Sequence, residues 1–370
     1  MMPHFSLSEA DVWSIDRSDM VGKIAAWPRQ VEEQRQALAE EPWPRMPRPS
    51  LLAVGGMGGL VIAADLVFAL AADRLPFPTL VCREDRWPAA VGPGALALLS
   101  SYSGDTAETL ALYDEAGRRG AGRVVLSTGG TLGRRADLDG VARRSLPGGL
   151  PPRAALGYSV VSLALLLEAL GDPGEGDTAW NEAVSVLDDL AARCAPGRPE
   201  AGNPAKTLAR ELVGRAVSVV GTAGPAAAIA RRWKGQLHEN AKTLAFDAVL
   251  PEMNHNEIVG YQALRDLHPR LALVFLDGLA GTPAVRARMD VTRAIVEEAG
   301  VATHVVAPEG RSTLARVLSL VVLGDWTSLY LAVLAGVDPT PIEKIDRLKA
   351  ALASAGGGGP AGVNPETSPR

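Results

Sequence analysis

The chain is predicted to be an α/β protein with two similar halves, each a doubly wound parallel sheet covered by helices. Short apolar strands alternate with helices along its 370 residues, an order typical of parallel sheets. The same order restarts after a linker rich in proline and glycine at 195–199. We therefore expect an N-terminal domain over 1–195, a C-terminal domain over 196–354 and a disordered tail over 355–370.

The first half opens with an amphipathic helix over about 17–40, which ends in a proline-rich stretch. Short apolar runs bounded by turn residues then predict strands, and longer periodic runs predict helices. The expected strands are 51–54, 96–101 and 123–126. One expected helix follows the glycine-rich turn after the first strand and ends at about residue 71, and the others are 105–118, 153–170 and 179–192.

The second half repeats this order with turns that contain glycine or proline. A helix over 203–213 leads into it, and the expected strands are 216–220, 271–275 and 302–306. The expected helices are 226–242, 282–299, 313–335 and 341–353.

Composition and charge exclude several classes of protein. The formal net charge of −5 disfavours a nucleic-acid binder, which would carry a basic surface. The two cysteines, Cys82 and Cys194, and five scattered histidines favour neither disulfides nor a metal site. The N-terminus is too acidic for a signal peptide, and the apolar stretches 51–64 and 154–167 are short for a bilayer. We expect a cytoplasmic protein without membrane contact.

A hydroxyl-rich segment, Ser101–Thr109, follows a predicted strand and begins a helix. Backbone N–H groups and the helix dipole favour an anion there, and Ser101, Ser103 and Thr106 add three neutral donors. This pattern suits a phosphate monoester, although Ser and Thr also cap ordinary helices. No Gly-Lys-Ser/Thr motif follows, which disfavours ATP chemistry.

A glycine-rich turn, Gly55–Gly59, occupies the same position after the first strand. Its start resembles a dinucleotide-binding pattern, but Val61 stands where the third glycine is needed. We expect instead that Gly58 and Gly59 let the backbone approach a small ligand closely.

The densest group of acid–base side chains lies in the second half. The segment Pro251–Glu257 combines one imidazole, two amides and two carboxylates, and Glu239 precedes His255 by sixteen residues. Such clusters indicate proton transfer, although a solvated carboxylate and a loop histidine would be the ordinary alternatives. Arg153 follows a rigid proline-rich turn at a helix start, where the dipole disfavours a cation.

Together these motifs resemble the bacterial and archaeal bifunctional phosphoglucose/phosphomannose isomerase family, which has two sugar-isomerase (SIS) domains of flavodoxin-like fold. The resemblance covers about residues 40–352, and Ser127–Gly130 and Val337–Pro341 support it. It implies an aldose–ketose isomerase that uses no cofactor or metal, in glycolysis and carbohydrate metabolism, and that interconverts glucose 6-phosphate or mannose 6-phosphate with fructose 6-phosphate.

The resemblance also implies roles for individual residues. Glu239 would move a proton between C1 and C2 through a cis-enediol, and His255 would assist ring opening. Arg153 would stabilise the enediolate, and a lysine of the last helix, Lys349 or alternatively Lys344, would complete the site. The phosphate would bind Ser101, Ser103 and Thr106. In related enzymes the histidine comes from the partner subunit, which implies a homodimer with shared active sites.

One departure from the family turn leaves alternatives open. The family usually has serine after the last glycine, whereas this chain has Leu60, and Ala63 and Ala64 replace glycines. This change fits an isomerase of both hexose phosphates, an isomerase of a different sugar phosphate, or a SIS-type protein that binds a phosphosugar without turnover.

Overall fold

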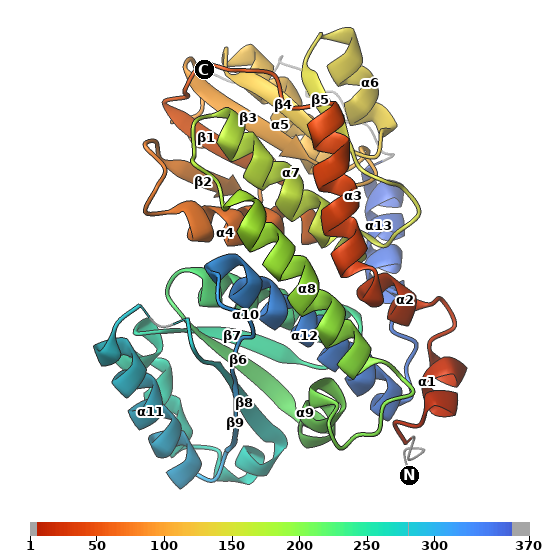
Figure 1. The fold of residues 1–370 in the computed structure, drawn as a ribbon, viewed down its shortest axis with the longest axis vertical. Coiled ribbons are helices and arrows are strands. Elements are labelled where there is room, and N and C mark those ends of the chain that lie inside the picture. The colour runs from red at the N-terminus through yellow and green to blue at the C-terminus, as the bar shows by residue number, and fades with distance from the viewer. Residues whose placement is uncertain (1–5, 280, 357–370) are drawn as a thin grey trace, which may run out of the picture.

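The computed structural model describes residues 6–279 and 281–356, without the side chains of Leu60, Ala353 and Ala355. It confirms an α/β protein with two parallel sheets, which lie in the upper and lower parts of Figure 1. The predicted tail over 355–370 lies outside the described residues, except that the last helix runs to Gly356.

The four strands of the C-terminal sheet repeat the order of the first four strands of the N-terminal sheet, with the first strand of each half between the second and the third. The N-terminal sheet contains β1 (Leu51–Gly56), β2 (Thr79–Cys82), β3 (Ala95–Ser100), β4 (Gly122–Ser127) and β5 (Ala142–Ser145), in the order β2-β1-β3-β4-β5. The C-terminal sheet contains β6 (Ala216–Thr222), β7 (Ala245–Leu250), β8 (Leu271–Leu276) and β9 (Ala302–Val306), in the order β7-β6-β8-β9.

Helices cover the sheets and join the halves. In the N-terminal half they are α1 (Glu9–Ile15), α2 (Met20–Ala25), α3 (Trp27–Glu40), α4 (Gly59–Ala71), α5 (Ala107–Arg118), α6 (Gly130–Leu138), the 3-10 turn η1 (Pro152–Ala154), α7 (Leu156–Ala169) and α8 (Gly176–Cys194). In the C-terminal half they are α9 (Pro204–Leu212), α10 (Pro225–Glu239), the 3-10 segments η2 (Glu252–His255), η3 (Glu257–Gln262) and η4 (Arg265–Arg270), and α11 (Pro283–Glu298), α12 (Thr313–Ala335) and α13 (Glu343–Gly356).

One hydrophobic cluster extends across both halves, and each sheet packs against a further, separate cluster on its other face. A single cluster of buried side chains runs from α1–α4 through α7 and α8 to α9, α10 and α12. Helix α8 crosses from the upper to the lower half in Figure 1. Helix α12 is apolar and long enough to cross a membrane, but its apolar stretch is wholly buried inside the protein, as in the central helix of a globular core. Because the core is continuous, the boundary at residue 195 stays a prediction.

Several predicted elements were wrong or missing. The sequence reading missed β2, β5 and β7, which are edge strands with partly exposed residues and lack the continuous apolar run of a central strand. It also missed α1 and α6. The predicted helix over 17–40 is two helices, because Pro28 has no N–H to donate and is tolerated in the first turn of α3 but not within a longer helix.

Two corrections concern the candidate site. The predicted helix over 153–170 begins three residues later, so Arg153 lies in η1 rather than in the helix. Helix α10 ends at Glu239 instead of 242, because Lys242 adopts a left-handed backbone conformation with φ of 53°.

Candidate active site

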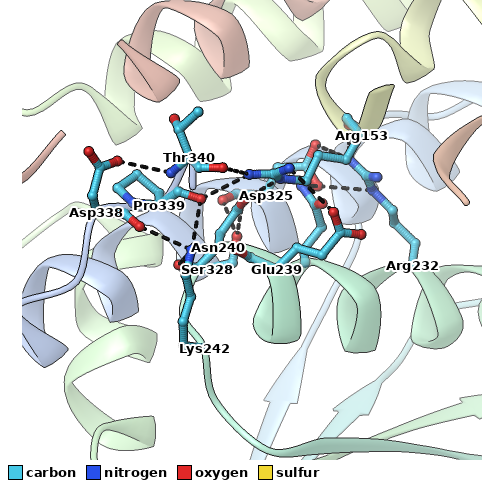
Figure 2. Close-up of polar contacts among 11 residues, drawn as sticks. Arg153, Arg232, Glu239, Asn240, Lys242, Asp325, Ser328, Asp338, Pro339 and Thr340 are labelled. Atoms are coloured by element: carbon cyan, nitrogen blue, oxygen red, sulfur yellow. Dashed lines mark hydrogen bonds and ion pairs between the residues drawn. The ribbon is translucent and has the colours of Figure 1, made fainter. Parts of the chain in front are cut away.

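Arg153 is the most enclosed charged side chain of the predicted site and is only 3% exposed. Its Nε donates to Asn240 Oδ1 at 2.7 Å, and its Nη1 lies 3.3 Å from Glu239 Oε2. Nη2 donates to the carbonyls of Pro339 and Thr340 at 2.9 and 2.8 Å (Figure 2). Burial lowers the pKa of Arg153, and the Glu239 carboxylate opposes this shift. The guanidinium is thus held rigidly beside one carboxylate.

Glu239 is the last residue of α10, and its side chain keeps about a third of its surface, 32%, exposed. A carboxylate at a helix C-terminus faces the negative end of the dipole, so it gains from a nearby cation. Arg153 supplies that cation, and Oε1 forms no recorded hydrogen bond within the described chain. The pair therefore offers a partly open carboxylate next to a fixed positive charge.

Behind this pair lies a buried polar hub centred on Asp325 of α12, which is 1% exposed. Its two carboxylate oxygens accept from Arg232 at 3.2 and 2.9 Å, from Gln236 at 2.8 Å and from Trp27 at 3.0 Å. Arg232 Nη2 also donates to the carbonyl of Arg153 at 2.7 Å (Figure 2). The hub connects α3, α10, α12 and η1, so it fixes the backbone that carries the Arg153 guanidinium.

Sequence reasoning missed this hub. Arg232, Gln236 and Asn240 recur at intervals of four residues, which places them on one face of α10. Polar residues at this spacing on one helix face, among apolar neighbours, were the sequence pattern that indicates such a hub. Asp325 gave a second signal, because it is a lone carboxylate within the apolar run 313–335.

The predicted phosphate residues form a compact loop between β3 and α5. Ser101 Oγ lies 2.9 Å from Thr106 Oγ1 and accepts from the Gly104 N–H at 3.1 Å. Ser103 is exposed, and its Oγ accepts from the Asp105 N–H at 3.2 Å. Thr106 is the N-cap residue of α5, but its side chain forms no capping hydrogen bond. The hydroxyls therefore do not serve as ordinary helix caps.

This loop lies at the point where the strand order of the N-terminal sheet reverses. The ends of β1 and β3 are neighbours, with Gly56 paired to Ser100, while β2 and β4 lie on opposite sides. Ligands of open α/β sheets bind at such switch points, outside the carboxyl ends of the strands. The two motifs that follow β1 and β3, Gly58–Gly59 and Ser101–Thr106, are thereby brought to one place.

The two glycines differ in what surrounds them. Among the atoms that the structure describes, a Cβ on Gly58, whose φ is 66°, would meet none within 4 Å. A Cβ on Gly59 would lie 3.1 Å from Cα of Arg153. Gly59 thus lets η1 approach the start of α4 closely, which links the glycine turn to Arg153. The side chain of Leu60 lies outside what the structure describes.

A tyrosine joins the phosphate loop to the turn that precedes Arg153. Tyr102 donates from its hydroxyl to the Pro147 carbonyl at 2.7 Å, and the same oxygen accepts from the Leu150 N–H at 3.0 Å. The hydroxyl-rich loop, the glycine turn and Arg153 are therefore mechanically connected, although they lie far apart in sequence.

His255 and the two lysines are placed differently. His255 ends η2, is exposed, and forms no recorded hydrogen bond within the described residues. Lys344 and Lys349 are exposed on α13, and among the described residues neither forms a hydrogen bond or ion pair with Glu239 or Arg153. The structure instead brings Lys242 next to the Arg153–Glu239 pair, at the Pro339 carbonyl (Figure 2).

Other features do not coincide with this site. Among the residues described, no group of three or more His, Cys, Asp or Glu side chains could hold a metal ion. A hollow of about 930 Å³ lies between α3, α8 and the proline-rich segment, and it contains none of the predicted site residues. The candidate site is therefore identified by its side chains and its place in the fold, not by cavity size.

Comparisons with known proteins assign the chain to a family. Residues 201–352 match the bacterial phospho-glucose isomerase C-terminal SIS domain. A bifunctional phosphoglucose/phosphomannose isomerase of Caldicellulosiruptor bescii is 39% identical over 82% of this chain and 89% of the relative. The protein of that name from Aquifex aeolicus is 34% identical over 80% and 88%. A solved structure of a hypothetical protein from Thermus thermophilus, 17% identical, covers 95% of this chain and 94% of its own with a TM-score of 0.69, which supports the fold. This chain belongs to the bifunctional phosphoglucose/phosphomannose isomerase family.

Proposed function

We propose that this protein interconverts glucose 6-phosphate or mannose 6-phosphate with fructose 6-phosphate, without a cofactor. The observation that carries the proposal is the pair of Glu239 and Arg153, a partly open carboxylate held 3.3 Å from a buried guanidinium. The hydroxyl-rich loop at the switch point supplies donors for a phosphate monoester. A protein that only binds a phosphosugar would have no use for a base beside a fixed cation.

The proposed reaction moves hydrogen within one molecule. The Glu239 carboxylate takes the proton from C2 of the open-chain aldose, and the electrons shift to the carbonyl oxygen at C1, which forms an enediolate. Arg153 stabilises that negative charge in a water-poor setting, as an oxyanion-hole donor does. A proton moves from the C2 hydroxyl to that oxygen, and the carboxylic acid returns its proton to C1. A ketose results, so the formula is unchanged and no external oxidant is needed.

His255 suggests a homodimer with shared sites. Its exposure in the single chain supports a role toward a second subunit, where His255 of the partner subunit would exchange the proton of the sugar ring oxygen. An apolar groove of about 410 Å³ lies beside it, between η2–η3 and α11. Val291 and Ile295 line this groove and are 60% and 42% exposed, which fits a face covered by a second copy of the chain.

The proposed setting is sugar metabolism, including glycolysis, in the cytoplasm. Both cysteines are free and buried, which agrees with a reducing compartment. This part of the proposal would be tested by locating the tagged protein in fractionated cells.

The decisive experiment is a coupled assay of the purified protein with glucose 6-phosphate and mannose 6-phosphate separately. We expect fructose 6-phosphate from both, formed about 10²–10⁴-fold more slowly by the Glu239→Gln variant. Turnover of neither substrate, together with binding of both in calorimetry, would favour the phosphosugar-binding alternative. Binding of neither would point to a different sugar phosphate.

A further inference from the structure

Lys242 follows the end of α10 and adopts an unusual backbone conformation. Its φ is 53°, in the left-handed region that costs a non-glycine residue about 1–2 kcal/mol. Glycine or asparagine normally occupies such positions just after a helix. A lysine here indicates that its side chain has a task that offsets the backbone cost.

The Lys242 ammonium is hydrogen-bonded to main-chain carbonyls. Nζ donates to Glu239 O at 2.7 Å, to Asp338 O at 3.0 Å and to Pro339 O at 3.2 Å, and it lies 3.4 Å from Asn240 O (Figure 2). An ammonium has three N–H donors, so none remains for a substrate. Lys242 can therefore act only through the groups that it holds.

Those groups belong to both parts of the proposed site. One carbonyl is that of Glu239 itself. The Pro339 carbonyl is shared with Arg153, whose Nη2 also donates to it at 2.9 Å. The segment 338–340 leads directly into α13, whose residues 343–352 are all exposed. The Lys242 and Arg153 side chains thus hold segment 338–340, which precedes the exposed helix α13, against the C-terminal end of α10.

The electrostatic setting agrees with this geometry. Burial and the Arg153 cation lower the pKa of Lys242, while Asp338, Glu239 and Glu343 oppose the shift. Lys242 as a residue is exposed, so water screens part of these effects, and the hydrogen-bond geometry is the stronger observation.

We propose that Lys242 is a positioning residue, which sets the distance between the Glu239 carboxylate and the Arg153 guanidinium by tying segment 338–340 to the end of α10. The proposal rests on the isomerase function proposed above. A shift of about 1 Å between reacting groups can cost on the order of a hundredfold in rate. Lys242 therefore matters for turnover more than for the affinity of the phosphate, which binds at another loop.

The experiment compares Lys242→Met, Lys242→Arg and Lys242→Gly with the wild type in the coupled assay. We expect Lys242→Met to lower kcat by about ten- to a hundredfold with less than about a twofold change in KM. Lys242→Arg should recover most of the loss, because a guanidinium can also donate to several carbonyls. Lys242→Gly removes the backbone strain and the ammonium together, so it should fold well and still be slow.

Lys234→Met is the matched control, because Lys234 lies within α10 itself and pairs with Asp247 instead of the Glu239–Arg153 region. It should keep kcat near the wild-type value. Wild-type kcat in Lys242→Met, or recovery of activity in Lys242→Gly, would overturn the proposal. So would a kcat loss in Lys234→Met as large as that in Lys242→Met.

Hydrogen exchange separates this proposal from the proposed function, because it needs no turnover. Faster exchange over 340–346 in Lys242→Met, but not in Lys234→Met, is expected whether or not the protein is an isomerase. Unchanged exchange there would refute the fastening role. If the wild type turns over neither hexose phosphate while exchange changes as expected, the proposed function fails and the fastening role stands.

Discussion

Replacing Asp325 by asparagine should destabilise the protein strongly, because this carboxylate is the centre of the buried hub. It is 1% exposed and accepts four hydrogen bonds, two of them from Arg232. Asparagine keeps the volume but removes the charge and turns an NH2 group toward other donors. Breaking a buried ion pair in this way costs about 3–5 kcal/mol, because Arg232 keeps its charge without a partner.

The loss can be converted to a melting temperature. Unfolding entropy is about 2.1 cal/mol/K per residue, so the 370-residue chain gives roughly 0.8 kcal/mol per degree if it unfolds as one unit. The continuous core supports that assumption. Asp325→Asn should therefore lower Tm by about 4–6 °C.

Differential scanning calorimetry measures this shift, and Glu200→Gln is the matched control. Glu200 also accepts two bonds from an arginine, Arg210, but the pair is exposed, with side chains 38% and 41% accessible. Such a pair contributes about 0–1 kcal/mol, so its loss should move Tm by about 1 °C or less. If Asp325→Asn melts within about 1 °C of this control, the stabilising role of the hub is wrong.

Four further predictions follow from the site. Glu239→Gln should keep the fold and sugar-phosphate binding but lower kcat by about 10²–10⁴-fold, and a kcat near wild type in the coupled assay would remove Glu239 as the base. EDTA should leave the rate unchanged, since the described residues contain no ligand cluster; loss on chelation that added metal restores would contradict the mechanism. Ser103→Ala should mainly raise KM, by about ten- to a hundredfold, because one hydrogen bond to a charged phosphate is lost in ground and transition states alike; a loss confined to kcat would argue against a phosphate role. The pKa of Lys242 falls to about 8, so its ammonium is charged below that pH and loses a proton above it. The kcat of the wild type should therefore decline above about pH 8, whereas that of Lys242→Arg should not. Identical pH profiles would show that Lys242 does not titrate in this range.

The sequence alone determined the class of fold and several of the motifs. Central strands such as β1, β3 and β8 are buried on both faces, so each is a largely continuous apolar run that can be recognised locally. The turns after β1 and β3 contain glycines and hydroxyl side chains, and the turn conformations that these residues favour can also be recognised locally. The edge strands β2 and β5 escaped detection because each has only four residues, and β7 because Asp247 interrupts its apolar run, whereas the edge strand β9 was predicted. No local pattern records which neighbour a strand pairs with.

Only the tertiary structure decided how Arg153 and Glu239 meet. They are 86 residues apart, and their contact depends on Asp325 of α12 and on Asn240, which follows Glu239 at the end of α10. The hub residues are polar side chains whose partners come from distant elements, so their burial cannot be read from their own segments. A local pattern reports the conformation of a segment, whereas a buried charge is tolerated only after folding has supplied its partner.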